Sequence, residues 1–327
     1  MKVCPSTLKE RTDGSYSPGA LRRLSDRRAF PKRLDFGSEE FTEFRAKIVD
    51  RMSISGVQDK LSLRLERGKL LPVAAGGQYI LKPVPNLKLP RLADDVPANE
   101  HLTMQLAEQI FGIDTAANTF IPFADGEPAY LTRRFDRTFD GEQIAQEDFC
   151  QLSGRTPHTA GRNYKYEGSY EEMGDLLRQF CSAHMVETER IFRRIVVNYA
   201  LANGDAHLKN FSLRQTDEFG DYVLSPAYDL LCTQLHLPEE SRLALDLFRD
   251  DEIPAHVLTY GFVTGADLLE LANRLGVLNR RAETIIDDVI KGSTECEPLV
   301  ERSFLSPRAK TLYLEIIDDR RRALEIG

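Results

Sequence analysis

The first half of the chain shows the alternation of apolar and polar residues that is typical of β-strands. In KLSLRLERGKLLPV, Leu61, Leu63 and Leu65 alternate with polar residues, and the E-R-G-K stretch predicts a turn into a second strand. This segment is therefore expected to form a β-hairpin. Further strands are expected at 78–82 and 129–135, and the residues up to about 38 are expected to form a loop-like leader.

A helical pattern interrupts these strands once and then dominates the second half. Residues 98–111 carry Leu102, Leu106 and Ile110 on one stripe, which predicts an amphipathic helix that ends at Gly112. From about residue 169 onward the helical period prevails. Helices are expected at 170–184, 186–202, 265–275, 282–290 and 307–324.

The order of these elements predicts the fold class. Two short strands, 210–213 and 222–224, are expected directly after the most polar motif of the helical half. A β-rich lobe with one helix, followed by a helical lobe that carries such a hairpin, is the layout of protein kinases. We therefore predict an α+β, bilobal, protein-kinase-like fold. Its expected parts are an N-terminal leader at 1–48, a β-rich N-lobe with phosphate loop and hinge at 49–150, and a helical C-lobe with catalytic loop and metal-binding motif at 151–327.

Composition and charge narrow the class of protein. The 327 residues are 42% hydrophobic, which suits a folded chain with a sizeable core. A formal net charge of −8 provides no basic field for a phosphate backbone, so direct nucleic-acid binding is not expected. The five cysteines form no C-x-x-C pair, so neither a zinc site nor a disulfide framework is expected, and a cytoplasmic location fits. The sequence shows no signal peptide and no run of about 18 apolar residues, so membrane association is not expected.

The segment 203–210, NGDAHLKN, contains the residue types that phosphoryl transfer requires. Asp205 and Asn210 have the spacing at which a kinase catalytic loop places its base and a magnesium ligand. Asp229 follows the short hairpin, where a second metal carboxylate is expected. Taken alone, Asp205 and Asn210 could be turn and cap residues. The preceding helix, the hairpin and Asp229, in that order, favour the catalytic interpretation.

Three more polar residues have two interpretations each. His207 could be a polar core residue or a partner of phosphate and aspartate. Lys209 could be a surface lysine or a cation beside the base. Lys82 would be a surface lysine in isolation, but it ends a predicted strand at the position of a kinase strand lysine, with Glu100 as its expected partner.

A serine- and glycine-rich turn, SISGVQDK, precedes the first predicted strand. It spans residues 53–60 and could fold its backbone N–H groups over phosphates, with Lys60 nearby. A plain β-turn is the alternative. The turn matches neither a Walker A motif nor a G-x-G-x-x-G loop.

The ordered set SISGVQDKL, YILKPV, NEHLTMQLA, TRRFDR, FRRIVVNYALANGDAHLKNFSL and SPAYDL resembles the HipA family of bacterial kinase toxins. The resemblance covers about residues 50–235. The CP near the start, the stretch YSPGALRRLS and a beginning close to the phosphate loop are more similar to the short HipT branch than to full-length HipA. The N-terminal subdomain of full-length HipA is accordingly expected to be missing.

The resemblance implies a role for each candidate residue. It implies a catalytic set of Asp205, His207 and Lys209, and it implies that Asn210 and Asp229 bind Mg2+. The implied ATP-binding set is Ser55, Gly56, Val57, Gln58, Lys60, Lys82, Arg133, Phe135, His207 and Tyr228. Ser53 and Ser55 match the loop serines that such kinases autophosphorylate. Arg133 stands where the family often has glutamate, so adenine contacts carry over to this strand only as backbone contacts.

The resemblance also implies a biological role. The chain would be an ATP-dependent serine/threonine kinase, the toxin of a toxin–antitoxin system, that phosphorylates an aminoacyl-tRNA synthetase. Separate small antitoxin proteins are expected, one replacing the missing subdomain and one binding DNA. Two alternatives stay open: a small-molecule phosphotransferase, which shares the Asp-to-Asn spacing, and a pseudokinase that serves only in a repressor complex. The phosphorylatable turn argues against the first, and the intact Asp205, Asn210, Asp229 and Lys82 argue against the second.

Overall fold

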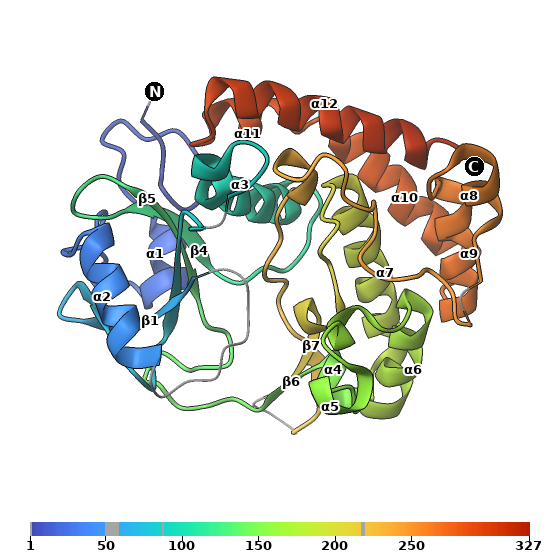
Figure 1. The fold of residues 1–327 in the computed structure, drawn as a ribbon, viewed down its shortest axis with the longest axis horizontal. Coiled ribbons are helices and arrows are strands. Elements are labelled where there is room, and N and C mark those ends of the chain that lie inside the picture. The colour runs from blue at the N-terminus through green and yellow to red at the C-terminus, as the bar shows by residue number, and fades with distance from the viewer. Residues whose placement is uncertain (1, 50–58, 87, 217–219, 251) are drawn as a thin grey trace. The chain divides into compact units, whose positions relative to one another are not determined.

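The computed structural model describes residues 2–49, 59–86, 88–216, 220–250 and 252–327, and it divides into two compact units (Figure 1). The first unit, called the sheet unit below, comprises Met1–Gln105, Ala116–Gln143 and Pro298–Lys310. The second, called the helical unit, comprises Leu106–Thr115, Ile144–Glu297 and Thr311–Gly327. Each unit collects segments that are distant in sequence.

The sheet unit is built on five antiparallel strands in the order β2-β1-β3-β5-β4. The strands are β1 (Leu61–Glu66), β2 (Lys69–Pro72), β3 (Tyr79–Pro83), β4 (Asn118–Pro122) and β5 (Pro128–Arg133). The predicted hairpin is present as β1 and β2, joined at Arg67 and Gly68, which both have positive φ. The helical segments are α1 (Pro18–Ser25), α2 (Ser38–Val49), η1 (Ala93–Asp95), α3 (Val96–Gln109) and α11 (Glu297–Arg302), with α3 and α11 crossing the unit boundary.

The leader, expected to be loop-like, instead contains two helices. Ser17 caps the first by accepting a hydrogen bond from the Ala20 N–H, and Pro18 occupies its first turn, both of which favour a helix start. This helix, α1, buries Leu24 in a small cluster with Cys4. The second helix, α2, begins at Ser38, and its Phe41 packs into the main core of the sheet. The loop prediction was therefore wrong for the first helix, because capping and tertiary burial outweigh the local polarity. The second helix begins where the predicted loop ends, and it was not predicted.

The two faces of this sheet have different roles. Leu81 of β3 and Leu131 of β5 are paired in register and point into the apolar core that α2 covers. The next pair along the strands, Lys82 and Tyr130, points to the opposite face because side chains alternate along a strand. Glu100 of α3 reaches Lys82 on that face. The period of the strand thus separates a purely apolar face from a face that carries a buried charge.

The helical unit combines helices with a small antiparallel sheet in the order β6-β7-β8. The strands are β6 (Gln146–Asp148), β7 (Ser212–Gln215) and β8 (Tyr222–Leu224). The helices are α4 (Phe149–Leu152), α5 (Pro157–Ala160), α6 (Tyr170–Phe180), α7 (His184–Ala200), α8 (Ala255–Tyr260), α9 (Gly265–Leu275), α10 (Asn279–Ser293) and α12 (Pro307–Leu324), and the 3-10 turns are η2 (Tyr164–Tyr166), η3 (Leu208–Asn210) and η4 (Thr233–Leu235). The predicted short hairpin is confirmed as β7 and β8.

Helix α7 is the centre of this unit. It packs against α6, α9 and α10, and its buried side chains include Ile191, Phe192 and Ile195 (Figure 1). Such burial on several sides explains why the helix carries few solvent-facing residues in its second half. The helix ends directly before the NGDAHLKN segment, so a buried helix supports this polar loop.

Two further findings concern the environment of the chain. All five cysteines are free and buried, as their scatter along the sequence suggested. Among the residues that the structure describes, none of the helices is both long and apolar enough to span a membrane.

Candidate active site

The loop after α7 is shaped by its backbone. Ala202 takes the left-handed conformation, with φ of +52°, and ends the helical path. Gly204 follows because its position has no room for a side chain: an added Cβ would stand 2.4 Å from the Ser241 carbonyl oxygen. The Gly204 N–H donates to Thr233 Oγ1 at 2.8 Å. These contacts fix the N-G-D turn and present Asp205 at a defined place.

The Asp205 carboxylate is accessible, with 44% of its side chain exposed. Its Oδ1 accepts a hydrogen bond of 2.6 Å from the hydroxyl of Tyr166, at the end of η2. Burial raises the pKa of Tyr166, and the hydrogen bond to Asp205 adds to this effect, so the phenol keeps its proton and acts as the donor. Asp205 therefore has the exposure and the hydrogen-bonding position of a general base, already engaged by a hydroxyl.

His207 lies beside this carboxylate. Its Nε2 is 4.0 Å from Asp205 Oδ2, and the ring packs edge-on against Tyr166. Burial lowers the pKa of His207 more than the neighbouring Asp205 raises it, so the imidazole is neutral at neutral pH. Its buried Nδ1 has no hydrogen-bond partner in the described part of the chain. His207 thus combines the two predicted interpretations: it is buried, and it contacts the candidate base.

Asn210 and Asp229 come together although 19 residues separate them. Asn210 Nδ2 lies 3.4 Å from Asp229 Oδ2, and Asn210 Oδ1 accepts from the His207 N–H at 3.1 Å. Carboxylate and amide oxygens are ligands that Mg2+ prefers, so this pair fits the predicted metal role by its donor chemistry. No group of three or more His, Cys, Asp or Glu that could hold a metal occurs among the described residues.

Hydrogen bonds to the backbone at and before Asp229 stabilise its unusual conformation. Its φ is +55°, which is uncommon for a non-glycine residue and costs about 1–3 kcal/mol. Asn203 Nδ2 donates to the Asp229 carbonyl at 3.4 Å and to Asn198 Oδ1 at 2.8 Å. The buried Arg194 donates to the Ser225 carbonyl at 2.7 Å, four residues earlier. These contacts compensate for the strain and direct the carboxylate toward Asn210.

Lys209 is engaged by a residue that the sequence did not indicate. Its Nζ donates to Asp148 Oδ2 at 2.7 Å. Burial is the largest single influence and opposes the charged form, but the hydrogen bond to Asp148 and the negative charge of that carboxylate, with smaller contributions from Tyr164 and Cys150, together raise the pKa of Lys209. Tyr228 donates its hydroxyl to the Lys209 carbonyl at 2.8 Å, so Tyr228 supports the backbone of the same loop.

The double role of Asp148 leads to a stability prediction. Asp148 Oδ1 caps α4 by accepting from the Gln151 N–H at 3.0 Å, while Oδ2 accepts from Lys209. We expect Asp148→Ala to lower the free energy of unfolding by about 1–3 kcal/mol, because it removes a cap and a charged hydrogen bond together. Asp148→Asn keeps a capping oxygen and should cost less. Urea unfolding of the three proteins measures this, and equal midpoints for Ala and wild type would contradict it.

In the sheet unit, Lys82 and Glu100 form a buried ion pair. Lys82 Nζ donates to Glu100 Oε1 at 2.7 Å, with only 11% and 3% of the two side chains exposed. The ammonium also lies 5.6 Å from the ring centre of Tyr130. The predicted partnership of strand lysine and helix glutamate is thus present in the structure.

The remaining predicted nucleotide residues of this unit have varied surroundings. The guanidinium of Arg133 lies over the ring of Phe139 at 3.8 Å and donates to the Arg137 carbonyl at 2.9 Å. Phe135 is half-buried, and Lys60 is exposed just before β1. The side chain of Arg133 is thus occupied within the protein. The predicted residues Ser53, Ser55, Gly56, Val57 and Gln58 lie outside the described residues.

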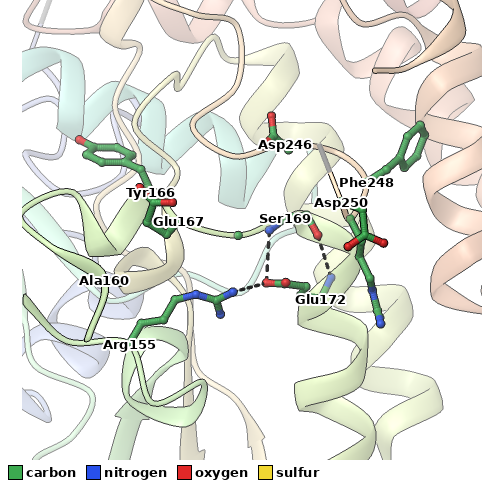
Figure 2. A pocket seen from close by; sticks show the side chains of 11 residues that line it. Arg155, Ala160, Tyr166, Glu167, Ser169, Glu172, Asp246, Phe248 and Asp250 are labelled. Carbon is green, nitrogen blue, oxygen red and sulfur yellow. Dashed lines mark hydrogen bonds and ion pairs between the residues drawn. The ribbon is translucent and has the colours of Figure 1, made fainter. Parts of the chain in front are cut away.

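A polar pocket of about 560 Å³ opens in the helical unit, and Tyr166 forms part of its wall (Figure 2). Across it, Arg155 forms an ion pair of 2.7 Å with Glu172, whose oxygen also accepts from the Ser169 N–H. The full lining is Arg155, Ala160, Tyr166, Glu167, Gly168, Ser169, Glu172, Asp246, Phe248, Arg249 and Asp250. Since Tyr166 contacts Asp205, the pocket and the candidate base share one residue.

Comparison with known proteins identifies the family. Residues 52–296 match the model of the HipA-like C-terminal domain. The chain belongs to the HipA-like family. This match includes both polar centres described above, Lys82 with Glu100 and the NGDAHLKN segment with Asp229.

Relatives of this HipA-like protein differ in length. A Haemophilus influenzae protein named "Putative kinase" is 31% identical over 89% of this chain and 87% of its own length. Two kinase-named proteins of Sinorhizobium fredii are each 33% identical over 60% and 63% of the chain. The chain spans about half the length of these two, 46% and 51%.

Solved structures confirm the kinase-like fold. HipA of Shewanella oneidensis, determined in complex with HipB and operator DNA, has a TM-score of 0.61 at 21% identity, over 84% of this chain and 65% of its own. The Helicobacter pylori proinflammatory kinase CtkA has a TM-score of 0.51 at 14% identity, over 81% of this chain and 90% of its own. At such identities the likeness concerns the fold.

Proposed function

We propose that this HipA-like protein is an ATP-dependent serine/threonine protein kinase. The observation that supports this best is the exposed Asp205 carboxylate, which already accepts a hydroxyl hydrogen bond at 2.6 Å. A general base for phosphoryl transfer must lie within hydrogen-bond reach of the acceptor hydroxyl. The adjacent Asn210 and Asp229 supply the oxygen ligands that a magnesium nucleotide needs.

The proposed roles follow the chemistry of each group. Magnesium-bound ATP supplies the transferable γ-phosphoryl group. Asp205 accepts the proton of the acceptor hydroxyl, and Asn210 and Asp229 hold the metal. Lys82, fixed by Glu100, contacts the phosphates, and the neutral His207 packs beside the base. Lys209 contributes positive charge close to the loop while Asp148 limits its movement.

The proposal for the biological role of the protein rests on its sequence motifs. We propose membership of the short HipT branch, autophosphorylation on Ser53 or Ser55, and toxicity through phosphorylation of an aminoacyl-tRNA synthetase in the cytoplasm. Separate small antitoxin proteins would then bind the chain, one of them binding DNA. The complex of Shewanella HipA with HipB and operator DNA supports the expectation of a DNA-binding partner.

Self-labelling tests the proposal. The purified protein should incorporate phosphate from γ-labelled ATP and Mg2+, with the label mapped by mass spectrometry to Ser53 or Ser55. A variant with Ser53→Ala and Ser55→Ala should lose that label, because no hydroxyl is left in the turn, whereas the wild-type control retains it. No phosphate on wild-type protein, and none on any protein of a lysate from its host, would refute kinase activity.

A further inference from the structure

The hydrogen bond between Tyr166 and Asp205 places a tyrosine hydroxyl where a kinase would bind its acceptor. We propose that Tyr166 occupies the place of the acceptor hydroxyl on Asp205, keeps water from the Oδ1 atom of this base, and leaves only when a polypeptide acceptor displaces it. This inference rests on the proposed kinase function. Under this proposal, Tyr166 determines which acceptors are phosphorylated.

The geometry of Asp205 supports this assignment. The Tyr166 hydroxyl donates to Oδ1 at 2.6 Å, which is the distance expected for a hydroxyl about to transfer its proton to a carboxylate. The other oxygen, Oδ2, faces His207 Nε2 at 4.0 Å. Oδ1, which accepts from Tyr166, is thus the oxygen to which the hydroxyl of an acceptor serine or threonine would have to donate. While the phenol holds it, neither water nor an acceptor can donate to it in the same geometry.

The attachment of Tyr166 allows it to move. It ends the three-residue turn η2 and is 38% exposed, in a segment between α5 and α6 that contains no longer helix. Gly161 and Gly168, on either side of this turn, have φ of +72° and +129°, conformations that glycine adopts without strain. The ring of Tyr166 packs edge-on against His207, and the Lys165 ammonium lies 4.7 Å from its centre. A short segment between two glycines can change its backbone at low cost.

The polar pocket gives a displacing polypeptide a place to bind. Tyr166 and Glu167 line one side of it, and Phe248 and Asp250 line the other side in the view of Figure 2. Charged and polar groups dominate the wall, which suits a hydrophilic loop and not an apolar ligand. A segment seated there lies against Tyr166, so binding and removal of the phenol would be coupled.

The chemistry requires this exclusion. In transfer, the acceptor O–H bond breaks and its proton moves to Asp205, while the acceptor oxygen bonds to the γ-phosphorus. The bond between the γ-phosphorus and the bridging oxygen breaks, and ADP leaves with the electron pair. Water at the same place would follow the same steps and release inorganic phosphate. A hydroxyl that holds the base until the acceptor arrives suppresses this hydrolysis.

The test compares Tyr166→Phe with wild type in one reaction with γ-labelled ATP and Mg2+. Phosphate release without added acceptor should rise about 10–100-fold, because the variant lacks the hydrogen bond from Tyr166 to the charged carboxylate, while self-labelling should not rise in proportion. Tyr164→Phe is the matched control, because Tyr164 lies in the same turn, whereas the hydroxyl that donates to Asp205 is that of Tyr166. It should leave both rates unchanged. Melting temperatures verify that both variants fold.

The outcomes separate this inference from the proposed function. If Tyr166→Phe lowers self-labelling and hydrolysis together, Tyr166 only orients Asp205 and the inference is wrong while the kinase remains. Increased hydrolysis that persists when Asp205→Asn is added to Tyr166→Phe would also overturn it, because the water would not depend on this base. Wild-type protein that neither labels itself nor hydrolyses ATP, with Asp205→Asn indistinguishable from it, would remove the proposed function and the inference with it.

Discussion

Replacing Asp205 by asparagine is expected to slow phosphoryl transfer by about 10²–10⁴-fold, the usual contribution of a general base. Asparagine has nearly the same shape, and its side-chain oxygen can still accept the hydrogen bond from Tyr166 that the structure shows at 2.6 Å. It cannot take up the proton of the acceptor hydroxyl. The loss should therefore appear in the rate of label incorporation at saturating ATP, with little change in nucleotide affinity or in the melting temperature.

Asp287→Asn provides the matched control for this variant. Asp287 lies on α10 of the same unit and is exposed. Its replacement by asparagine changes the net charge by the same amount as Asp205→Asn. Its transfer rate should equal that of wild type. Undiminished transfer by a well-folded Asp205→Asn protein would exclude Asp205 as the base, and equal losses in both variants would indicate a general effect of charge.

The fold could be predicted where local pattern and burial agree. Leu61, Leu63 and Leu65 alternate, and the structure forms the expected hairpin there. The leader could not be predicted in the same way. The second helix is mainly polar, and it is Phe41, buried against a distant strand, that accounts for its packing. Such a contact depends on tertiary structure that a local pattern does not contain.

The same distinction between local pattern and tertiary contact applies to the candidate site. Asp205, Asn210 and Asp229 were found because their spacing is that of a catalytic loop, and the structure brings Asn210 and Asp229 to 3.4 Å. Neither Tyr166 nor Asp148 was predicted as a site residue. They contact Asp205 and Lys209 across 39 and 61 residues of sequence. A single sequence offers no periodicity or spacing that would reveal contacts over such separations.

Lys82→Met is expected to lower the free energy of unfolding by about 3–5 kcal/mol, the typical cost of breaking a buried ion pair by removing one partner. The side chain of Glu100 is only 3% exposed, so water cannot replace the lost ammonium at 2.7 Å. Methionine fills most of the volume that lysine leaves, so the loss reports the broken ion pair and not a cavity. Urea unfolding monitored in the sheet unit, for example by hydrogen exchange of β3, measures the change.

Two companion variants decide whether the buried charge is the cause. Lys69→Met makes the same substitution in the same unit, but its pair with Asp35 at 2.9 Å is 65% and 55% exposed, so we expect a change of at most about 1 kcal/mol. Glu100→Gln combined with Lys82→Met removes the second charge and should recover part of the lost stability, because a neutral amide is less costly to bury than a carboxylate that has lost its ammonium partner. If the double variant were as unstable as Lys82→Met alone, packing of the lysine stem would account for the loss, and the ion pair would not.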